Sequence, residues 1–313
     1  MTNAVMIAPS DLKESLNSLP SLADYQLYLI ARRPRLTLTG VSGGRGAWTF
    51  DLENPAGETL AADLTPADGE DFHVAYEEGG YSVSLSRDGT VFFTGKPSLL
   101  PNLKATGALD RVDAEEDPAI AHLDLEVLYI GKSDDNRGVA YQRLNSHSTL
   151  QQILADHLDH APDYEIWVIP MRFGALNTVT VVHGHDSERD LAASIEIAKK
   201  GYAPVLGQKS IVALAEAASI RYFQPEYNVH YKKSFPSRQH ISYDDVWPFD
   251  FGALGVVIDT LGPIGCRIWG PGAAPSFHHE DHFPVDPITV RRPLFTVEHV
   301  LGLYGDSKPA TKA

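Results

Sequence analysis

The first third of the chain alternates apolar and polar residues with a period of two in several short runs. Residues 36–39, 48–52 and 81–85 follow this pattern, and turn-forming Gly, Asn, Asp and Pro residues separate the runs. A period of two places successive side chains on opposite faces of a strand, so it is typical of half-buried strands. We therefore predict a small antiparallel sandwich or sheet here, with a hairpin turn at residues 87–90.

The middle third changes to the three-to-four-residue spacing of apolar positions that amphipathic helices show. Strand patterns return in the last third of the chain. In chain order, the predicted elements of these two thirds are strand 123–130, helices within 139–160 that join near Ser148, strand 164–171, strand 177–182, helix 188–200, helix 210–223, and strands 255–259, 266–269 and 293–300.

This order of elements predicts an α+β protein in which a small mixed sheet with helices is flanked by N- and C-terminal antiparallel β regions. We divide the chain into an N-terminal β-rich domain (1–117), a central domain (118–240) and a C-terminal β-rich region (241–313). Two arrangements of the outer regions fit the pattern. They form separate domains, or they pack together as one sheet that the central domain interrupts.

Charge is unevenly distributed along the 313 residues. The formal net charge is -15, which argues against a general nucleic-acid binder with a basic footprint. However, residues 1–117 carry -9 of this charge, and residues 118–240 carry only -2. Lysines and arginines between residues 199 and 238 give the second half of the central segment a basic excess. A phosphate-facing patch and a merely solvated surface are both compatible with this excess.

The sequence also bears on location. No apolar run reaches the length of a membrane-spanning helix, and the N-terminus lacks the pattern of a signal peptide. The single cysteine, Cys266, excludes an internal disulfide and is typical of a reducing compartment. We therefore expect a cytoplasmic protein with no membrane partner.

Three polar residues of the predicted helices suggest chemistry. Arg143 and His147 lie four residues apart and so share one helix face, and an arginine can contact a phosphate with two parallel hydrogen bonds. Glu216 falls between Val212 and Ile220 on an apolar stripe, where a carboxylate is costly unless it is paired or binds a cation. The alternatives are a solvated helix surface for the first pair and a rotated helix for Glu216.

These residues belong to a longer series of motifs. Tyr129-Ile130-Gly131-Lys132-Ser133 is followed by Arg143-Leu144-Asn145-Ser146-His147, then Glu216-Ala217-Ala218-Ser219-Ile220, and finally Pro225-Glu226-Tyr227-Asn228. In this order, residues 120–235 resemble the GIY-YIG nuclease superfamily, whose members carry a small mixed sheet flanked by helices.

The resemblance implies a role for each matching residue. By this analogy, the catalytic residues are Tyr129 for proton handling, Arg143 for phosphate charge, His147 for water activation and Glu216 as the ligand of Mg²⁺ or Mn²⁺. Gly131 and Asn228 would support the site. We also expect Lys132, Lys232 and Lys233 to bind phosphate.

The resemblance predicts a metal-dependent endonuclease or phosphodiesterase that acts on nucleic acid, DNA rather than RNA. The other half of the motif, Gly-Ile-Tyr, does not occur in the twenty residues before Tyr129. This leaves open a second hypothesis, a catalytically degenerate GIY-YIG-like domain that serves as a binding or interaction module.

Two histidine clusters form the basis of a third hypothesis, a zinc-dependent hydrolase. His183, His185 and Asp186 follow an apolar run, and residues 278–282 hold three histidines with two carboxylates. Imidazole and carboxylate groups suit zinc. The favoured interpretation of the first cluster is an exposed loop end. The second cluster has no fixed ligand spacing, so its favoured interpretation is a polar loop.

Overall fold

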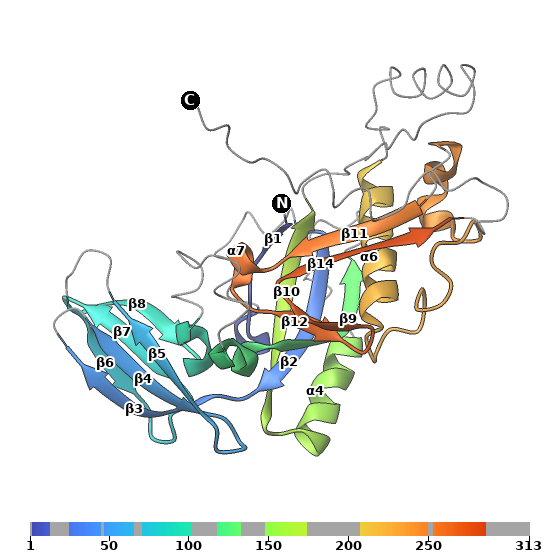
Figure 1. Ribbon diagram of the computed structural model, residues 1–313. Coiled ribbons are helices and arrows are strands. Elements are labelled where there is room, and N and C mark those ends of the chain that lie inside the picture. The colour runs from blue at the N-terminus through green and yellow to red at the C-terminus, as the bar shows by residue number, and fades with distance from the viewer. Residues whose placement is uncertain are drawn as a thin grey trace, which may run out of the picture.

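The structure, a computed structural model, describes residues 2–12, 25–44, 47–65, 71–101, 118–132, 148–173, 207–249 and 253–285. Figure 1 shows a central sheet with helices, and a lobe of further strands that projects from one end of it. Helices and several mixed or antiparallel sheets make this an α+β protein, as predicted. No helix in the described ranges combines the length and the apolar character needed to cross a membrane.

The central sheet has six strands. In spatial order they are β1 (Thr2–Ala4), β10 (Tyr164–Phe173), β2 (Leu27–Pro34), β9 (Leu125–Lys132), β12 (Ile268–Gly270) and β13 (Ala273–Ser276). Neighbouring strands are antiparallel except β9 and β12, which are parallel. All three segments of the predicted division contribute strands, so the sheet crosses the expected boundaries at residues 117 and 240.

The alternation of side chains along β2 assigns its residues to two cores. Leu27 and Leu29 belong to the larger buried cluster, and Tyr28 and Ile30 belong to the smaller one. Because successive side chains of a strand point to opposite faces, these clusters cover opposite faces of the sheet. Burial on both faces explains why β2 has a continuous apolar run instead of the alternating pattern used above to predict strands.

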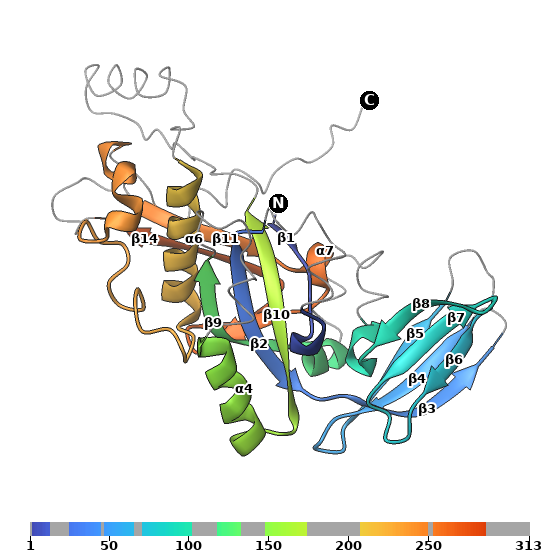
Figure 2. The same cartoon turned by 180° about the vertical axis from the view of Figure 1, so that it is seen from behind.

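One helix covers each face of the sheet. The helix α4 (Ser148–His160) contributes Leu150 and Ile153 to the cluster that contains Tyr28. The helix α6 (Gln208–Phe223) contributes to the cluster that contains Leu27. Figure 2 shows the sheet and both helices from behind.

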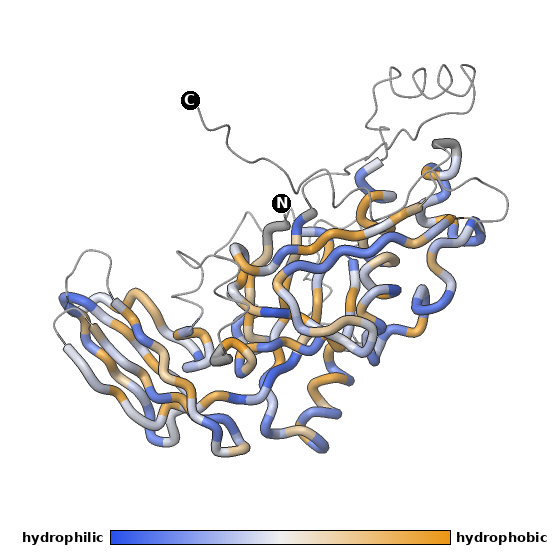
Figure 3. The backbone as a smooth tube through the Cα atoms, viewed as in Figure 1, coloured by the Kyte–Doolittle hydropathy of each residue, from blue (hydrophilic) through white to orange (hydrophobic). Residues whose placement is uncertain are grey.

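A two-stranded ribbon packs on α6. Its strands are β11 (Ala253–Asp259) and β14 (His278–Pro284). In Figure 3 β11 is mostly hydrophobic and β14 mostly hydrophilic. Leu254, Val256 and Ile258 of β11 are buried in the protein interior. Covered by the sheet, the ribbon and a nearby 3-10 segment, α6 buries most of its residues, which explains its high content of Ala and other apolar side chains.

The projecting lobe consists of two antiparallel meanders. Their strands are β3 (Thr37–Gly43), β4 (Trp48–Glu53), β5 (Thr59–Leu64), β6 (His73–Tyr76), β7 (Val83–Arg87) and β8 (Thr90–Gly95). The predicted antiparallel strands and hairpin of this region are confirmed. At the β7–β8 turn Asp88 and Gly89 have φ of 49° and 77°, as a two-residue hairpin turn requires.

The lobe is an insertion between β2 and β9. The chain leaves β2 at Pro34, forms the lobe and re-enters the sheet at Leu125. Because β2 and β9 are antiparallel neighbours, Pro34 and Leu125 lie at the same end of the pair, and Leu27 and Lys132 lie at the other. The lobe therefore takes the place of a hairpin turn, and it leaves the opposite end of both strands undisturbed.

The strands predicted at 123–130, 164–171, 255–259 and 266–269 and the helix at 210–223 are confirmed within a few residues. The predicted strands 177–182 and 293–300 and the helix 188–200 lie outside the described residues. The remaining described elements are η1 (Pro9–Asp11), η3 (Pro97–Leu99), η4 (Pro118–Leu123), η6 (Ile241–Phe249) and α7 (Leu261–Ile264).

Candidate active site

The C-terminal end of β9 carries Tyr129, Gly131 and Lys132, and β2 places a second tyrosine beside them. Tyr28 pairs directly with Gly131 in the antiparallel register, and the ring centroids of Tyr28 and Tyr129 are 6.1 Å apart. The sequence analysis missed Tyr28 because the whole inserted lobe separates it from Tyr129. The signal was present as Gln26-Leu27-Tyr28 at the start of an apolar run.

Gly131 has a packing reason to be glycine. A Cβ atom at this position would lie 2.5 Å from Tyr28 Oη and 2.8 Å from Tyr129 Cε1. Both distances are shorter than a van der Waals contact allows, so a larger residue would push the tyrosine rings away. Gly131 thus lets the two aromatic rings pack closely against the backbone at the end of β9.

Glu216 and Lys132 form an ion pair across the space between α6 and β9. Lys132 Nζ lies 3.4 Å from Glu216 Oε2, and the two side chains are 28% and 13% exposed. Lys132 pairs with Leu27, so its side chain lies on the α6 face of the sheet and the Tyr28 side chain lies on the α4 face. At the end of β9, the Lys132–Glu216 ion pair therefore lies on one face of the sheet and the Tyr28 side chain lies on the other.

This ion pair explains how α6 accommodates the Glu216 carboxylate on its apolar stripe. Val212 and Ile220 are buried as predicted, and Glu216 between them is only partly exposed. A carboxylate in that place is stabilised by the facing ammonium group of Lys132. The alternative, a rotated helix that carries Glu216 into solvent, is therefore not needed to explain its position.

Asn228 clamps the free edge of β9. Its Nδ2 donates to Ile130 O and its Oδ1 accepts from Ile130 N, both at 2.8 Å. Among the described strands none continues the sheet beside Ile130, because β12 pairs with β9 only at Leu125 and Glu126. The amide of Asn228 thus replaces a neighbouring strand and satisfies a buried backbone N–H and C=O.

Tyr227 connects the Asn228 loop to the other helix. Its backbone N donates to Leu128 O at 3.0 Å, and its hydroxyl donates to Asp156 Oδ2 of α4 at 2.8 Å. Burial and the neighbouring Asp156 carboxylate raise the pKa of Tyr227 to about 12. The hydroxyl therefore stays a hydrogen-bond donor at any physiological pH.

Lys232 and Lys233 lie beyond the C-terminal end of α6. The helix ends at Gln224, which has a φ of 56° and precedes a proline, and the backbone oxygen of Lys232 accepts from both Arg221 Nη1 and Gln224 Nε2. This fixes the backbone of the basic segment. Within the described ranges no carboxylate pairs with the ammonium group of Lys232 or Lys233.

The remaining predicted residues, Arg143 and His147, lie outside the described residues, and α4 begins directly after His147 at Ser148. The same is true of His183, His185 and Asp186. The described candidate residues at the end of β9 are therefore Tyr28, Tyr129, Gly131, Lys132, Glu216 and Asn228, and Lys232 and Lys233 lie beyond the end of α6.

The expected Mg²⁺ or Mn²⁺ ion needs side-chain ligands near the end of β9. Among the described residues, no group of three His, Cys, Asp or Glu side chains could hold a metal ion. Mg²⁺ does not require such a group, because it keeps several waters and is commonly bound by one or two carboxylates together with substrate phosphates. The single partly exposed carboxylate of Glu216 is compatible with that kind of coordination.

The histidine-rich segment forms a strand, so the interpretation of residues 278–282 as a polar loop is wrong. His279 points inward, where its ring contacts Ile268 O at 3.0 Å and Tyr222 Oη at 3.2 Å. Burial lowers the pKa of His279. His278 and His282 lie on the opposite face of β14 beside Glu280. The three histidines therefore do not converge, and these residues do not support the zinc-hydrolase hypothesis.

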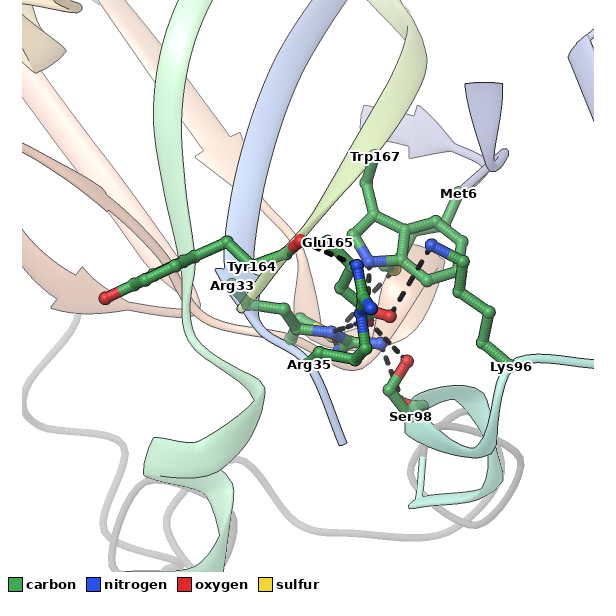
Figure 4. A network of polar contacts seen from close by, with 9 residues as sticks. Met6, Arg33, Arg35, Lys96, Ser98, Tyr164, Glu165 and Trp167 are labelled. Carbon is green, nitrogen blue, oxygen red and sulfur yellow. Dashed lines mark hydrogen bonds and ion pairs between the residues drawn. The ribbon is translucent and has the colours of Figure 1, made fainter. Parts of the chain in front are cut away.

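A second polar cluster lies where the lobe joins the sheet (Figure 4). Glu165 Oε1 accepts hydrogen bonds from Arg33 Nε at 2.8 Å, Trp167 Nε1 at 2.8 Å and Ser98 Oγ at 2.5 Å. Lys96 Nζ lies 3.6 Å from Glu165 Oε2. Burial raises the pKa of Glu165, but the charges of Arg33 and Lys96 more than offset this and hold the pKa below its usual value.

The burial of this cluster indicates a structural role. The side chains of Arg33 and Glu165 are 0% and 1% exposed, so a substrate has no access to them. Arg33 belongs to β2, Glu165 and Trp167 to β10, and Ser98 to η3 at the end of the lobe. The network therefore ties the lobe to the sheet.

Compared with protein-family models, with curated proteins and with solved structures, the chain matches none of them. The resemblance of the motifs to the GIY-YIG superfamily stays a prediction, and it depends on the geometry at the end of β9.

Proposed function

We propose that this protein is a metal-dependent endonuclease that hydrolyses phosphodiester bonds of nucleic acid, DNA rather than RNA, at the C-terminal end of β9. The observation that carries the proposal is Tyr28, which pairs with Gly131 and lies beside Tyr129. It supplies the tyrosine expected from the first half of a GIY-YIG motif. Gln26 and Leu27 stand where that motif has glycine and isoleucine.

In the proposed hydrolysis, each candidate residue has a separate role. Tyr28 and Tyr129 hold the attacking water and take part in moving its proton. Arg143, Lys132 and the basic segment with Lys232 and Lys233 attract the phosphate and offset its charge. His147 assists the activation of the water. Asn228 keeps the end of β9 in place.

Glu216 would hold the Mg²⁺ or Mn²⁺ ion. When bound, the ion supplies positive charge that stabilises the phosphate and the leaving oxygen. Glu216 lies in the middle of α6, which is packed on several sides, so the carboxylate is held by a rigid element.

The test is a cleavage assay on DNA and RNA substrates with Mg²⁺ or Mn²⁺, and with EDTA. Wild type is compared with Glu216→Gln, Arg143→Ala and Tyr28→Phe, and with Glu226→Gln as a matched control at an exposed carboxylate near the site. We expect metal-dependent cutting that is lost in Glu216→Gln and Arg143→Ala, is reduced in Tyr28→Phe and persists in Glu226→Gln. Cutting by Glu216→Gln at the wild-type rate would remove Glu216 from the mechanism.

The second candidate function is a catalytically degenerate domain that binds without cutting. Two observations favour it. The Glu216 carboxylate is already paired with Lys132, and the glycine and isoleucine of the motif are replaced. The second function is the correct one if neither wild type nor any folded variant cuts any substrate, while wild type still binds nucleic acid in the presence of EDTA.

A further inference from the structure

Lys132 forms an ion pair with Glu216, whose carboxylate the proposed function assigns to the metal. Its ammonium nitrogen lies 3.4 Å from Glu216 Oε2. We infer that Lys132 competes with the divalent metal for Glu216, and that a substrate phosphate releases the carboxylate by drawing Lys132 away. The inference rests on the proposed function, because it concerns the same site.

Of the two partners, the lysine is the one that can move. Glu216 extends from the middle of α6 and is the more buried side chain. Lys132 is the last residue of β9, its side chain is more exposed, and a flexible four-carbon stem carries its charge. The pairing of Lys132 with Leu27 fixes only the backbone, so the ammonium group can change partners without disturbing the sheet.

Electrostatics favours such an exchange. A lysine ammonium group has no lone pair and cannot join a metal's coordination shell. A divalent ion at Glu216 would place like charges within a few ångströms of each other, and they would repel each other. The ammonium group is then better paired with another anion, and in a nuclease site that anion is a backbone phosphate.

The consequence is coupling between two ligands. If phosphate draws Lys132 away, nucleic acid strengthens the binding of metal, and by linkage metal strengthens the binding of nucleic acid by the same factor. The competing explanation is that Lys132 only neutralises Glu216 in the fold. In that case its removal would destabilise the protein and would not improve metal binding.

The experiment measures Mn²⁺ binding directly, by electron paramagnetic resonance of the free ion, and so does not depend on activity. Each protein is titrated with Mn²⁺ alone and again with a short DNA duplex whose phosphorothioate linkages keep the charge and slow cleavage. The variants are Lys132→Gln, Lys132→Arg and Glu216→Gln. Lys209→Gln is the matched control, because it removes the same charge from an exposed position on α6.

We expect Lys132→Gln to bind Mn²⁺ about fivefold more tightly than wild type in the absence of DNA, the size of effect that a partly exposed ion pair of about 1 kcal/mol produces. DNA should strengthen Mn²⁺ binding in wild type and in Lys132→Arg, and should do so much less in Lys132→Gln. Lys209→Gln should behave like wild type, and Glu216→Gln should lose the site. Thermal melting confirms that each variant is folded.

Two results would overturn the inference in distinguishable ways. If Mn²⁺ binds through Glu216 but Lys132→Gln binds it no more tightly than wild type, Lys132 is not a competitor, and the nuclease proposal still stands on its cleavage assay. If neither wild type nor Lys132→Gln binds Mn²⁺, both the inference and the metal-dependent function fall together.

Discussion

Arg33 of β2 and Lys132 of β9 lie near opposite ends of these two strands, and each pairs with a carboxylate of a neighbouring element. The two pairs differ in burial. At the lobe end, Arg33 and Glu165 are 0% and 1% exposed and share hydrogen bonds with Ser98 and Trp167. At the opposite end, Lys132 and Glu216 are 28% and 13% exposed. A fully buried and hydrogen-bonded pair locks parts of the fold together, whereas a partly exposed pair can exchange its partners.

The two ends also differ in how the chain reaches them. The lobe end is where the insertion leaves and re-enters the sheet, so it needs a fixed attachment. The other end has no such constraint, and it gathers the tyrosines, a glycine and the Asn228 clamp. The insertion thus separates the two halves of the candidate site in sequence without separating them in space.

The largest expected effect concerns the buried pair. Glu165→Gln keeps the shape of the side chain but leaves Arg33 as an uncompensated buried charge, so we expect a loss of about 3–5 kcal/mol in the free energy of unfolding. Urea denaturation measures it. A Glu165→Gln variant as stable as wild type would show that the lobe is not held by this network.

The same pair should make stability depend on pH. The pKa of Glu165 is held below its usual value, so its ionised form stabilises the fold at neutral pH. This contribution is present above the unfolded pKa of about 4.3 and is lost as the pH falls through the lower folded pKa. We expect the stability gap between wild type and Glu165→Gln to narrow in acid. A gap that stays constant from neutral pH to about pH 3 would contradict the assignment.

At the opposite end, packing contributes more than charge. Gly131→Ala would force the rings of Tyr28 and Tyr129 apart, so we expect a loss of about 1–3 kcal/mol in the free energy of unfolding. Gly262→Ala serves as the control, because no atom lies within 4 Å of the position of its new methyl group. Equal stability of the two variants would mean that the rings adjust freely.

The Asn228 clamp should have a somewhat smaller effect. Asn228→Ala leaves the backbone N–H and C=O of Ile130 without their partner, so we expect a loss of about 1–2 kcal/mol in unfolding free energy. Hydrogen exchange of the Ile130 amide should accelerate in the variant. Gln239→Ala, at an exposed amide, should change neither quantity. Unchanged exchange at Ile130 would show that another group protects it.

The smallest effect on stability is expected at the partly exposed pair. Glu216→Gln should change the free energy of unfolding by less than about 1 kcal/mol, because solvent screens this pair. The urea series used for Glu165→Gln measures it under the same conditions. A loss as large as that of Glu165→Gln would place Glu216 among the structural residues and would weaken the proposal that it serves a metal.

Local patterns in the sequence predicted much of the fold. Alternating apolar residues identified β3, β4 and β7 of the lobe, the helical spacing of apolar residues identified α6, and an apolar run identified β10. The strands β2 and β14 were missed for opposite reasons. β2 is apolar on both faces and does not alternate, and β14 is so polar that it looked like a loop until its pairing with β11 was known.

The sequence by itself determined most elements of the fold and the candidate residues Tyr129, Gly131, Lys132, Glu216 and Asn228, because these residues lie in short motifs whose order along the chain can be recognised. Only the tertiary structure decided that Tyr28 lies beside Tyr129, that Lys132 faces Glu216, and that Arg33 meets Glu165. Each of these pairs joins residues far apart in the chain. Periodicity reports which face a side chain occupies, but strand pairing across an insertion decides which side chain it meets.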